Sequence, residues 1–101
     1  SIQIGNVRKL VNDEQLRLGF TIGRDPDSDL EIDHRDISRR HARVSVKDRK
    51  LMIEDLSSSN GTTVGGKKLK PGNQKHINSS SDVALANLPL VLVGLDSSAS
   101  K

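Results

Sequence analysis

Short runs of alternating apolar and polar residues recur along the whole chain, and residues that favour turns separate them about every six to twelve positions. The alternation is most regular over Leu16–Ile22 and Ala42–Val46, and a period of two is typical of strands with one buried face. No window keeps a helical period over about ten residues. Many short strands with frequent turns predict an all-β domain, either a sandwich or a barrel.

The expected strands and turns can be placed along the sequence in order. The strands are predicted at Ser1–Gly5, Arg8–Val11, Leu16–Ile22, Leu30–Ile32, Ala42–Val46, Leu51–Ile53, Thr62–Val64, Lys67–Lys70, Val83–Leu85 and Leu90–Val93. The turns and loops are predicted at Asn12–Gln15, Asp25–Asp29, Lys47–Lys50, Ser57–Gly61, Gly65-Gly66, Pro71-Gly72, Ser79–Ser81 and Asn87–Pro89, each of which contains Gly, Pro, Asn, Asp or Ser.

The composition limits the classes of protein to which the chain can belong. Its 101 residues are enough for one domain with its own core, and that core must be aliphatic because Phe20 is the only aromatic residue. The absence of cysteine excludes disulfides, thiolate metal sites and a cysteine nucleophile. A net charge of +3 suits an anionic partner without identifying one. No apolar run approaches the roughly 20 residues of a membrane span, so no membrane partner is expected.

The two ends of the chain suggest that it is part of something longer. The sequence does not begin with Met and ends in the Ser-rich stretch Asp96–Lys101, so we expect a segment of a larger protein or a processed terminus. No signal peptide is recognised at its start. Residues 1–95 are predicted to form the domain, and residues 96–101 are predicted to be a flexible, Ser-rich C-terminal tail.

The stretch Ile37–Val46 changes character in its middle. Its first part carries the hydroxyl and guanidinium donors of Ser38, Arg39 and Arg40, and its second part is an alternating strand. Donors on a loop that is held by a sheet are well placed to bind phosphate. Taken alone, such arginines are more often ordinary solvated loop residues.

Four short motifs occur in order along the middle of the chain. They are Gly23-Arg24, Ser38–Ala42, Asp55-Leu56 and Ser58–Thr62, with about a dozen residues between the first two and about sixteen between Ala42 and Ser59. Each motif is weak alone, since Asn60-Gly61 also marks a hairpin turn and Gly23-Arg24 a strand end. Together, over Phe20–Gly72, they resemble the forkhead-associated (FHA) family.

This resemblance implies a fold and a binding site. The FHA fold is a sandwich of two mostly antiparallel sheets with about eleven short strands, and loops at one edge bind phosphothreonine peptides. The resemblance assigns Arg24 and Ser38 to the phosphate, and Arg39 to a further polar or basic contact. It places Ser59 near the phosphothreonine and Asn60 on the peptide backbone, where its amide can both donate and accept.

The resemblance also implies residues that support the site. Gly23 and His41 match positions that chiefly maintain the shape of the loops in the family. We expect His41 to be neutral and to form hydrogen bonds that connect one loop to another. Gly61 is expected to adopt a backbone conformation closed to other residues. The implied protein is a monomeric, intracellular binding module without catalysis, cofactor or metal.

The loop residues Arg35 and Asp36 lie where FHA members vary and where the residue three positions after the phosphothreonine is often selected. We expect the Asp36 carboxylate to repel an acidic residue at that position and to tolerate a basic or apolar one. The match to the family becomes uncertain beyond Gly72, because Asn73–His76 replaces an acidic turn that is common there.

Three other motif matches fail on inspection. Gly61–Lys67 has the spacing of a P-loop, but Lys68 stands where Ser or Thr must bind magnesium, and no helix is expected to follow. Asp25–Asp29 resembles the start of a calcium loop, yet Leu30 replaces the glycine that such a loop needs. No nucleophile-elbow pattern surrounds Ser38, so a hydrolase triad with His41 and Asp55 is not supported.

Two alternative functions remain open from the sequence. The first is an FHA-like scaffold that binds an unphosphorylated partner or its own parent chain. The second is a nucleic-acid binder that uses the basic surface, but the chain lacks the aromatic residues that stack on bases, so no nucleic-acid partner is expected. The lysines of Lys67–Lys70 are expected to be a solvated edge that discourages aggregation.

Overall fold

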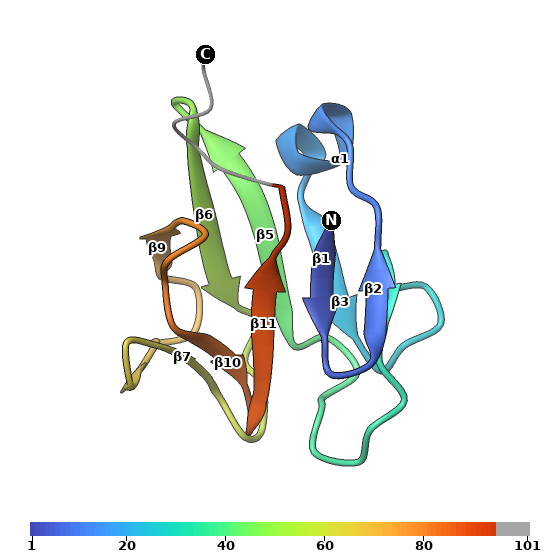
Figure 1. Cartoon of the computed structure of the whole chain (residues 1–101). Helices are drawn as coiled ribbons and strands as arrows, with labels where there is room; N and C mark the ends of the chain where they lie inside the picture. Colours follow the sequence, from blue (N-terminus) through green and yellow to red (C-terminus); the bar gives the residue numbers. More distant parts are fainter. Residues whose placement is uncertain (95–101) are drawn as a thin grey trace.

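The computed structural model, which describes residues 1–94, is a sandwich of two sheets (Figure 1). The six-stranded sheet has the order β2-β1-β11-β10-β7-β8, and the five-stranded sheet has the order β4-β3-β5-β6-β9. All pairs are antiparallel except β3 with β4. The prediction of a sandwich of two mostly antiparallel sheets with about eleven strands is confirmed. The elements are β1 Ile2–Ile4, β2 Val7–Lys9, α1 Asp13–Leu18, β3 Phe20–Gly23, β4 Leu30–Glu31, β5 Ala42–Lys47, β6 Lys50–Asp55, β7 Thr62–Val64, β8 Lys67–Lys68, β9 Gln74–Ile77, β10 Val83–Leu85 and β11 Leu88–Leu92.

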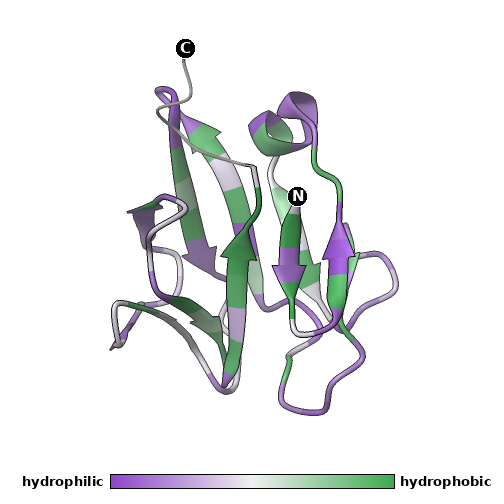
Figure 2. Ribbon diagram, in the orientation of Figure 1, coloured by the Kyte–Doolittle hydropathy of each residue, from purple (hydrophilic) through white to green (hydrophobic). Residues whose placement is uncertain are grey.

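The core lies between the two sheets and is almost entirely aliphatic, as the composition predicts. Figure 2 shows hydrophobic residues alternating with hydrophilic ones along the strands, because successive side chains point to opposite faces of a sheet. Phe20, Ile22, Val44 and Ile53 from the five-stranded sheet are completely buried. Burying each such side chain contributes about 1.5–3 kcal/mol, so this alternation accounts for much of the stability of the fold.

The predicted turn at Asn12–Gln15 and the start of the following strand are wrong. Residues 13–18 form the short helix α1, and β3 begins only at Phe20. Asn12 and Gln15 form a capping box, in which each side chain accepts a hydrogen bond from the backbone amide of the other, at 2.8 and 3.0 Å. The helix buries Leu16 but leaves Leu18 79% exposed, whereas a strand would place both on one face.

Three other expectations need correction. β9 at Gln74–Ile77 was not predicted, because it is an edge strand in which only Ile77 is buried. β2 lies at Val7–Lys9 rather than Arg8–Val11. β11 begins at Leu88, so the turn before it comes earlier than predicted and passes through Ala86, which has a φ of 56°. The predicted tail at 96–101 lies outside the described residues.

Both hairpin turns predicted in the middle of the chain are present. Asp48 and Arg49 have φ values of 54° and 66° between β5 and β6, and Gly65 and Gly66 have φ values of 60° and 81° between β7 and β8. Positive φ at both central residues matches the twist of the flanking strands.

In the part of the chain that the structure describes, no helix is long and apolar enough to cross a membrane.

Candidate functional site

Two loops of the five-stranded sheet lie side by side where β3 ends and β5 begins. The backbone amide of Arg24 donates to the carbonyl of Ser38 at 2.9 Å, and the amide of Asp25 donates to the carbonyl of Arg39 at 3.2 Å. Arg24 and Ser38 therefore lie at the same end of the molecule. These are the two residues that the resemblance assigns to the phosphate.

Gly23 makes this close approach possible. A Cβ atom at this position would lie 1.9 Å from the carbonyl oxygen of Arg39 and 3.1 Å from that of Ser38. The obstacle is backbone and cannot rotate away, so any side chain would push the two loops apart. Gly23 is needed for space rather than for a positive φ.

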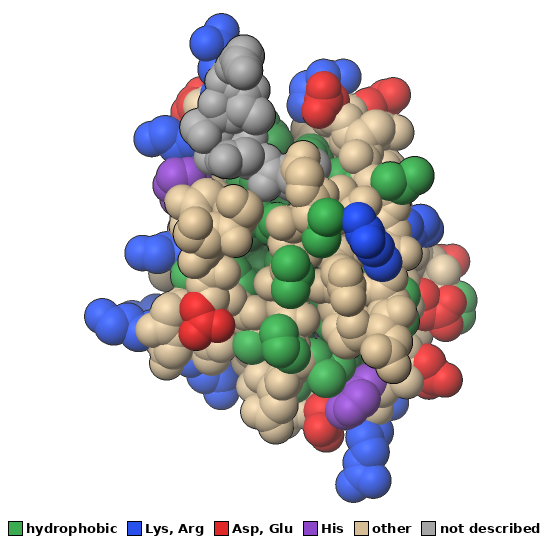
Figure 3. Space-filling model, in the orientation of Figure 1, with side chains coloured by type: hydrophobic (Ala, Val, Ile, Leu, Met, Phe, Trp, Pro, Cys, Tyr) green, Lys and Arg blue, Asp and Glu red, His purple; other side chains and the backbone are tan. Residues whose placement is uncertain are grey.

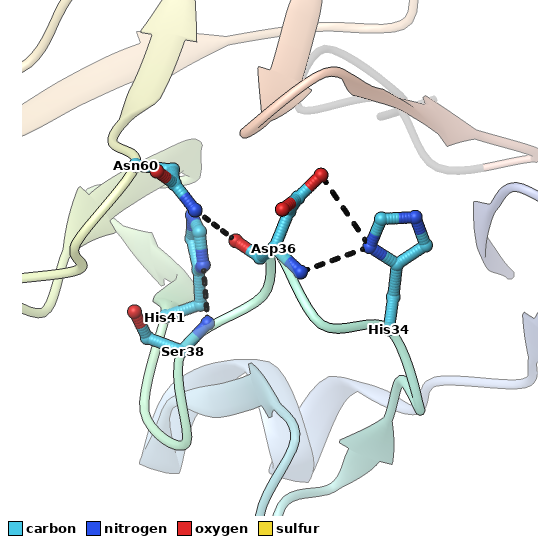
Figure 4. Close-up of polar contacts among 5 residues, drawn as sticks. All are labelled: His34, Asp36, Ser38, His41 and Asn60. Atoms are coloured by element: carbon cyan, nitrogen blue, oxygen red, sulfur yellow. Dashed lines mark hydrogen bonds and ion pairs between the residues drawn. The ribbon is translucent and has the colours of Figure 1, made fainter.

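A third loop, residues 56–61 between β6 and β7, joins this pair. The amide of Ser59 donates to the hydroxyl of Ser38 at 2.8 Å, across 21 residues of sequence. The side-chain amide of Asn60 donates to the carbonyl of Asp36 at 2.7 Å, as Figure 4 shows. The structure thus brings Arg24, Ser38, Ser59 and Asn60 into one cluster of connected loops.

His41 is buried between these loops. Its Nδ1 accepts the backbone N–H of Ser38 at 3.1 Å (Figure 4), and its Nε2 lies 2.9 Å from the carbonyl oxygen of Gly61. An amide can only donate and a carbonyl can only accept, so the imidazole is neutral with its hydrogen on Nε2. Burial lowers the pKa of His41 and outweighs the opposing effects of the Gly61 carbonyl and the Asp55 carboxylate.

Asp55 holds the third loop from beneath, a role that the sequence did not reveal. Its carboxylate accepts the amide of Ser58 at 3.1 Å, the hydroxyl of Ser58 at 2.5 Å and the hydroxyl of Thr62 at 2.7 Å. The Ser58 hydroxyl in turn accepts the amide of Gly61 at 2.9 Å. Asp55 follows Leu51 and Ile53 on the inward face of β6, and a carboxylate in an inward position is the signal that could have identified it.

Gly61 connects the loop to the other sheet. It has a φ of 88°, a value that favours glycine, and its carbonyl accepts hydrogen bonds from His41 and from the amide of Ala86. β6 and β7 belong to different sheets, so Asn60-Gly61 lies in a crossover loop and not in a hairpin turn.

Arginines surround the loop cluster. Arg24, Arg35, Arg39 and Arg40 are exposed, and none of them forms an ion pair with a carboxylate within residues 1–94. Acidic side chains also lie nearby: Asp25 borders a small hollow with Arg40, and the carboxylate of Asp36 lies 4.0 Å from Nδ1 of His34. A surface with several unpaired guanidinium groups and free hydroxyl hydrogens is suited to an anion. Among the described residues no group of His, Asp and Glu side chains could hold a metal ion.

The sequence model of the FHA domain family matches residues 20–86. Among curated proteins, the oxoglutarate dehydrogenase inhibitor of Corynebacterium diphtheriae is 34% identical over 73 residues, which cover 72% of this chain and 49% of that protein. Proteins of the same name from Corynebacterium efficiens and Corynebacterium glutamicum are 30% identical over 73 residues. The chain therefore spans about half the length of the curated relatives it matches.

Solved FHA domains have the same fold. The FHA domain of the CT664 protein from Chlamydia trachomatis is 28% identical with a TM-score of 0.74, and the match covers 93% of this chain and 95% of that one. The N-terminal FHA domain of Rad53p from S. cerevisiae, solved in complex with a phosphothreonine peptide, is 21% identical with a TM-score of 0.73 and coverages of 89% and 88%. From the family match and these relatives together, the chain belongs to the FHA domain family.

Proposed function

We propose that this chain is a phosphothreonine-dependent interaction module that binds a peptide segment of another protein. The observation that carries the proposal is the direct connection of the loops that bear Arg24, Ser38 and Ser59, within a rim of exposed arginines. Membership of the FHA family supports it, as does the phosphothreonine peptide bound to a domain of the same fold. The proposed role is that of a binding module and not of an enzyme.

The phosphate would be held by Arg24, Ser38 and Arg39. A guanidinium stays charged and offers paired donors to phosphate oxygens, which a lysine cannot do. The hydroxyl of Ser38 accepts a hydrogen bond from Ser59, so its oxygen is fixed and its hydrogen can point toward the phosphate. Gly23, His41 and Gly61 would then act by positioning these groups.

Ser59 and Asn60 would contact the rest of the peptide. Among residues 1–94 the side-chain carbonyl of Asn60 makes no hydrogen bond, so it can accept a peptide N–H while the amide nitrogen stays on Asp36. The exposed carboxylate edge of Asp36 should disfavour an acidic residue three positions after the phosphothreonine. Phosphothreonine peptides that differ only at that position test this preference, and selection of Asp or Glu there would contradict it.

The affinity should be moderate and should depend on the phosphate. A phosphate carries about −1.5 to −2 charges, and each charge-assisted hydrogen bond contributes about 1.5–3 kcal/mol. Two or three such bonds, less the loss of entropy on ordering the peptide, correspond to a dissociation constant of roughly micromolar.

Calorimetric titration with a phosphothreonine peptide library, followed by single variants, tests the proposal. We expect Arg24→Ala to abolish measurable binding and Ser38→Ala to weaken it by at least about tenfold, while thermal unfolding stays cooperative. Lys50→Ala, at the hairpin end of β6, is the control and should leave binding nearly unchanged. Undiminished binding by Arg24→Ala would exclude the assigned phosphate site.

A second candidate is a scaffold that binds an unphosphorylated partner or its own parent chain. It is favoured by the name of the curated relatives, which describes inhibition of an enzyme and not recognition of phosphate. Treatment of the captured partner with phosphatase separates the two candidates. Loss of binding supports the phosphothreonine module, and retained binding supports the scaffold.

A further inference from the structure

The outer face of the five-stranded sheet carries a row of polar residues across neighbouring strands. The paired residues are Thr21 on β3, Arg43 on β5, Glu54 on β6 and Gln74 on β9. Two hollows of about 320 and 280 Å³ lie on this row and share Arg43. We call this surface the basic groove; it is defined by Arg17, Thr21, Arg40, Arg43, Lys47, Glu54, Asp55 and Gln74.

The basic groove has an excess of positive charge. Four of the side chains that line the two hollows are cationic and two are acidic, and the carboxylate of Glu54 lies 3.9 Å from the guanidinium of Arg43. Asp55 accepts hydrogen bonds from Ser58 and Thr62, but these neutral donors do not cancel its formal charge. The excess of two positive charges is therefore concentrated at the end lined by Arg17, Arg43 and Lys47. Arg17, Arg40 and Lys47 have no carboxylate partner within the described part of the chain.

The opposite face of the sandwich differs. On the outer face of the six-stranded sheet, Figure 3 shows hydrophobic side chains near the centre, over β11, and Val91 of that strand is 48% exposed. The row of charged residues on the five-stranded sheet therefore has no counterpart along β11, whose residues are all apolar.

The groove begins next to the proposed phosphate site. Arg40 directly follows Arg39, and its side chain borders both the larger hollow and a smaller one of about 90 Å³ that is lined by Asp25 and Asp27, on the loop that follows Arg24. From there the groove runs along β5 to Lys47. From Arg40 to Lys47 there are seven residue steps, so at about 3.3 Å per residue the groove is roughly 23 Å long, which an extended peptide of about seven or eight residues can cover.

We propose that the basic groove binds an acidic segment of the same partner, several residues away from its phosphothreonine, at the end lined by Arg17, Arg43 and Lys47. The inference rests on the proposed function, because the bound phosphothreonine fixes where the segment lies. Charge complementarity with the groove indicates that the segment is acidic. A nucleic acid suits the groove less well, because the only aromatic residue of the chain, Phe20, is completely buried and offers no surface for stacking.

Titration of the 101-residue chain with matched peptides tests the inference. Each peptide contains the same phosphothreonine core, and an eight-residue extension at either end alternates Ala with either Glu or Gln. We expect the acidic extension at one end to tighten binding about fivefold to tenfold at 50 mM salt relative to the Gln extension, and the gain to shrink at 500 mM salt. Equal affinity of acidic and neutral peptides at both ends would overturn the proposal.

Two double variants show where the gain arises. Arg17→Gln with Lys47→Gln removes two charges from the far end of the groove, and should remove most of the gain while leaving the affinity for the neutral peptide unchanged. Arg8→Gln with Lys67→Gln removes the same charge from β2 and β8 of the six-stranded sheet and should preserve the gain. If both pairs reduce it equally, the effect is general electrostatic attraction and the groove is not a site.

A second measurement tests binding of the acidic segment to the groove even if the chain does not bind phosphothreonine. In ¹⁵N NMR spectra, an unphosphorylated alternating Glu/Ala peptide at low salt should shift the amide signals of Arg43, Ser45 and Gln74, and its Gln/Ala counterpart should not. Failure of the neutral phosphopeptide to bind would reject the proposed function alone. Shifts that spread over β8, or stronger shifts in the groove with a DNA oligonucleotide, would reject the acidic-segment proposal.

Discussion

At the scale of single residues, the loops are held together by contacts that other residue types could not make. Gly23 is the clearest case, because the backbone carbonyl of Arg39 leaves no room for a Cβ atom. His41 is another, because its two ring nitrogens must act as one acceptor and one donor. Both residues hold the loops in place, and we propose that neither of them contacts the peptide.

Gly23→Ala should displace the loop at Ser38 and Arg39 and should destabilise the domain by about 2–4 kcal/mol. The reason is the 1.9 Å separation between the added Cβ and the carbonyl oxygen of Arg39. Gly5→Ala is the control: its φ of 57° is unfavourable for alanine, but no atom lies within 4 Å, so a loss of about 1 kcal/mol is expected. Urea unfolding measures both, and equal losses would contradict the steric explanation.

The stability of the domain should fall as the pH falls below the ordinary histidine pKa of about 6.5. Burial lowers the pKa of His41 in the folded state, so the unfolded chain binds the proton more readily. The contribution of His41 is therefore fully present above pH 6.5 and is lost toward its lowered pKa. Urea unfolding between pH 7.5 and 5 should show a weaker pH dependence in His41→Gln than in the wild type; identical slopes would argue against this role.

At the scale of elements, α1 is the segment that the sequence pattern described least well. Its apolar residues alternate like those of a strand. The capping box of Asn12 and Gln15 nevertheless stabilises a helix, because it gives hydrogen-bond partners to backbone amides that the first turn of a helix leaves unpaired. Acidic Asp13 and Glu14 in that turn add a favourable interaction with the helix dipole. Asn followed three residues later by Gln is a recognisable capping-box pattern, so the helix could have been predicted from the sequence.

Asn12→Ala should destabilise the domain by about 1 kcal/mol, because a cap is lost. Phosphopeptide affinity should stay unchanged, since none of the hydrogen bonds among the site loops involves residues 12–18. Asn12→Asp, which retains a capping oxygen, is the matched control and should keep most of the stability. Chemical unfolding and peptide titration on the same samples measure the two effects; a loss of affinity would show that α1 supports the site.

At the scale of the whole molecule, the loop 56–61 joins the site to both sheets. It leaves β6 in one sheet, enters β7 in the other, and is fastened by Asp55, His41 and Ala86. Site geometry and sandwich stability are therefore coupled through one crossover.

Asp55→Asn should reduce both the stability of the domain and its affinity for the phosphopeptide. The amide keeps the shape of the carboxylate but loses its charge and one acceptor, so we expect a destabilisation of about 2–4 kcal/mol and weaker phosphopeptide binding. Glu54→Gln, next to it on the outer face of β6, is the control and should change the stability by less than about 0.5 kcal/mol. Measurements at 15 °C, where the variant remains folded, separate affinity from unfolding. Unchanged affinity would show that the loop does not depend on Asp55.

The sequence by itself determined the alternation that makes two aliphatic sheet faces, the hairpins at Asp48-Arg49 and Gly65-Gly66, and the family motifs around Arg24, Ser38 and Asn60. These features are local, because a period of two or a positive φ is encoded within a few residues. Only the tertiary structure decided that Ser38 meets Ser59 across 21 residues, that Asp55 supports the third loop, and that Arg17, Arg40 and Lys47 share one groove. Local patterns specify which face of a strand is buried, but the partners of a residue depend on which strands become neighbours when the sheets stack.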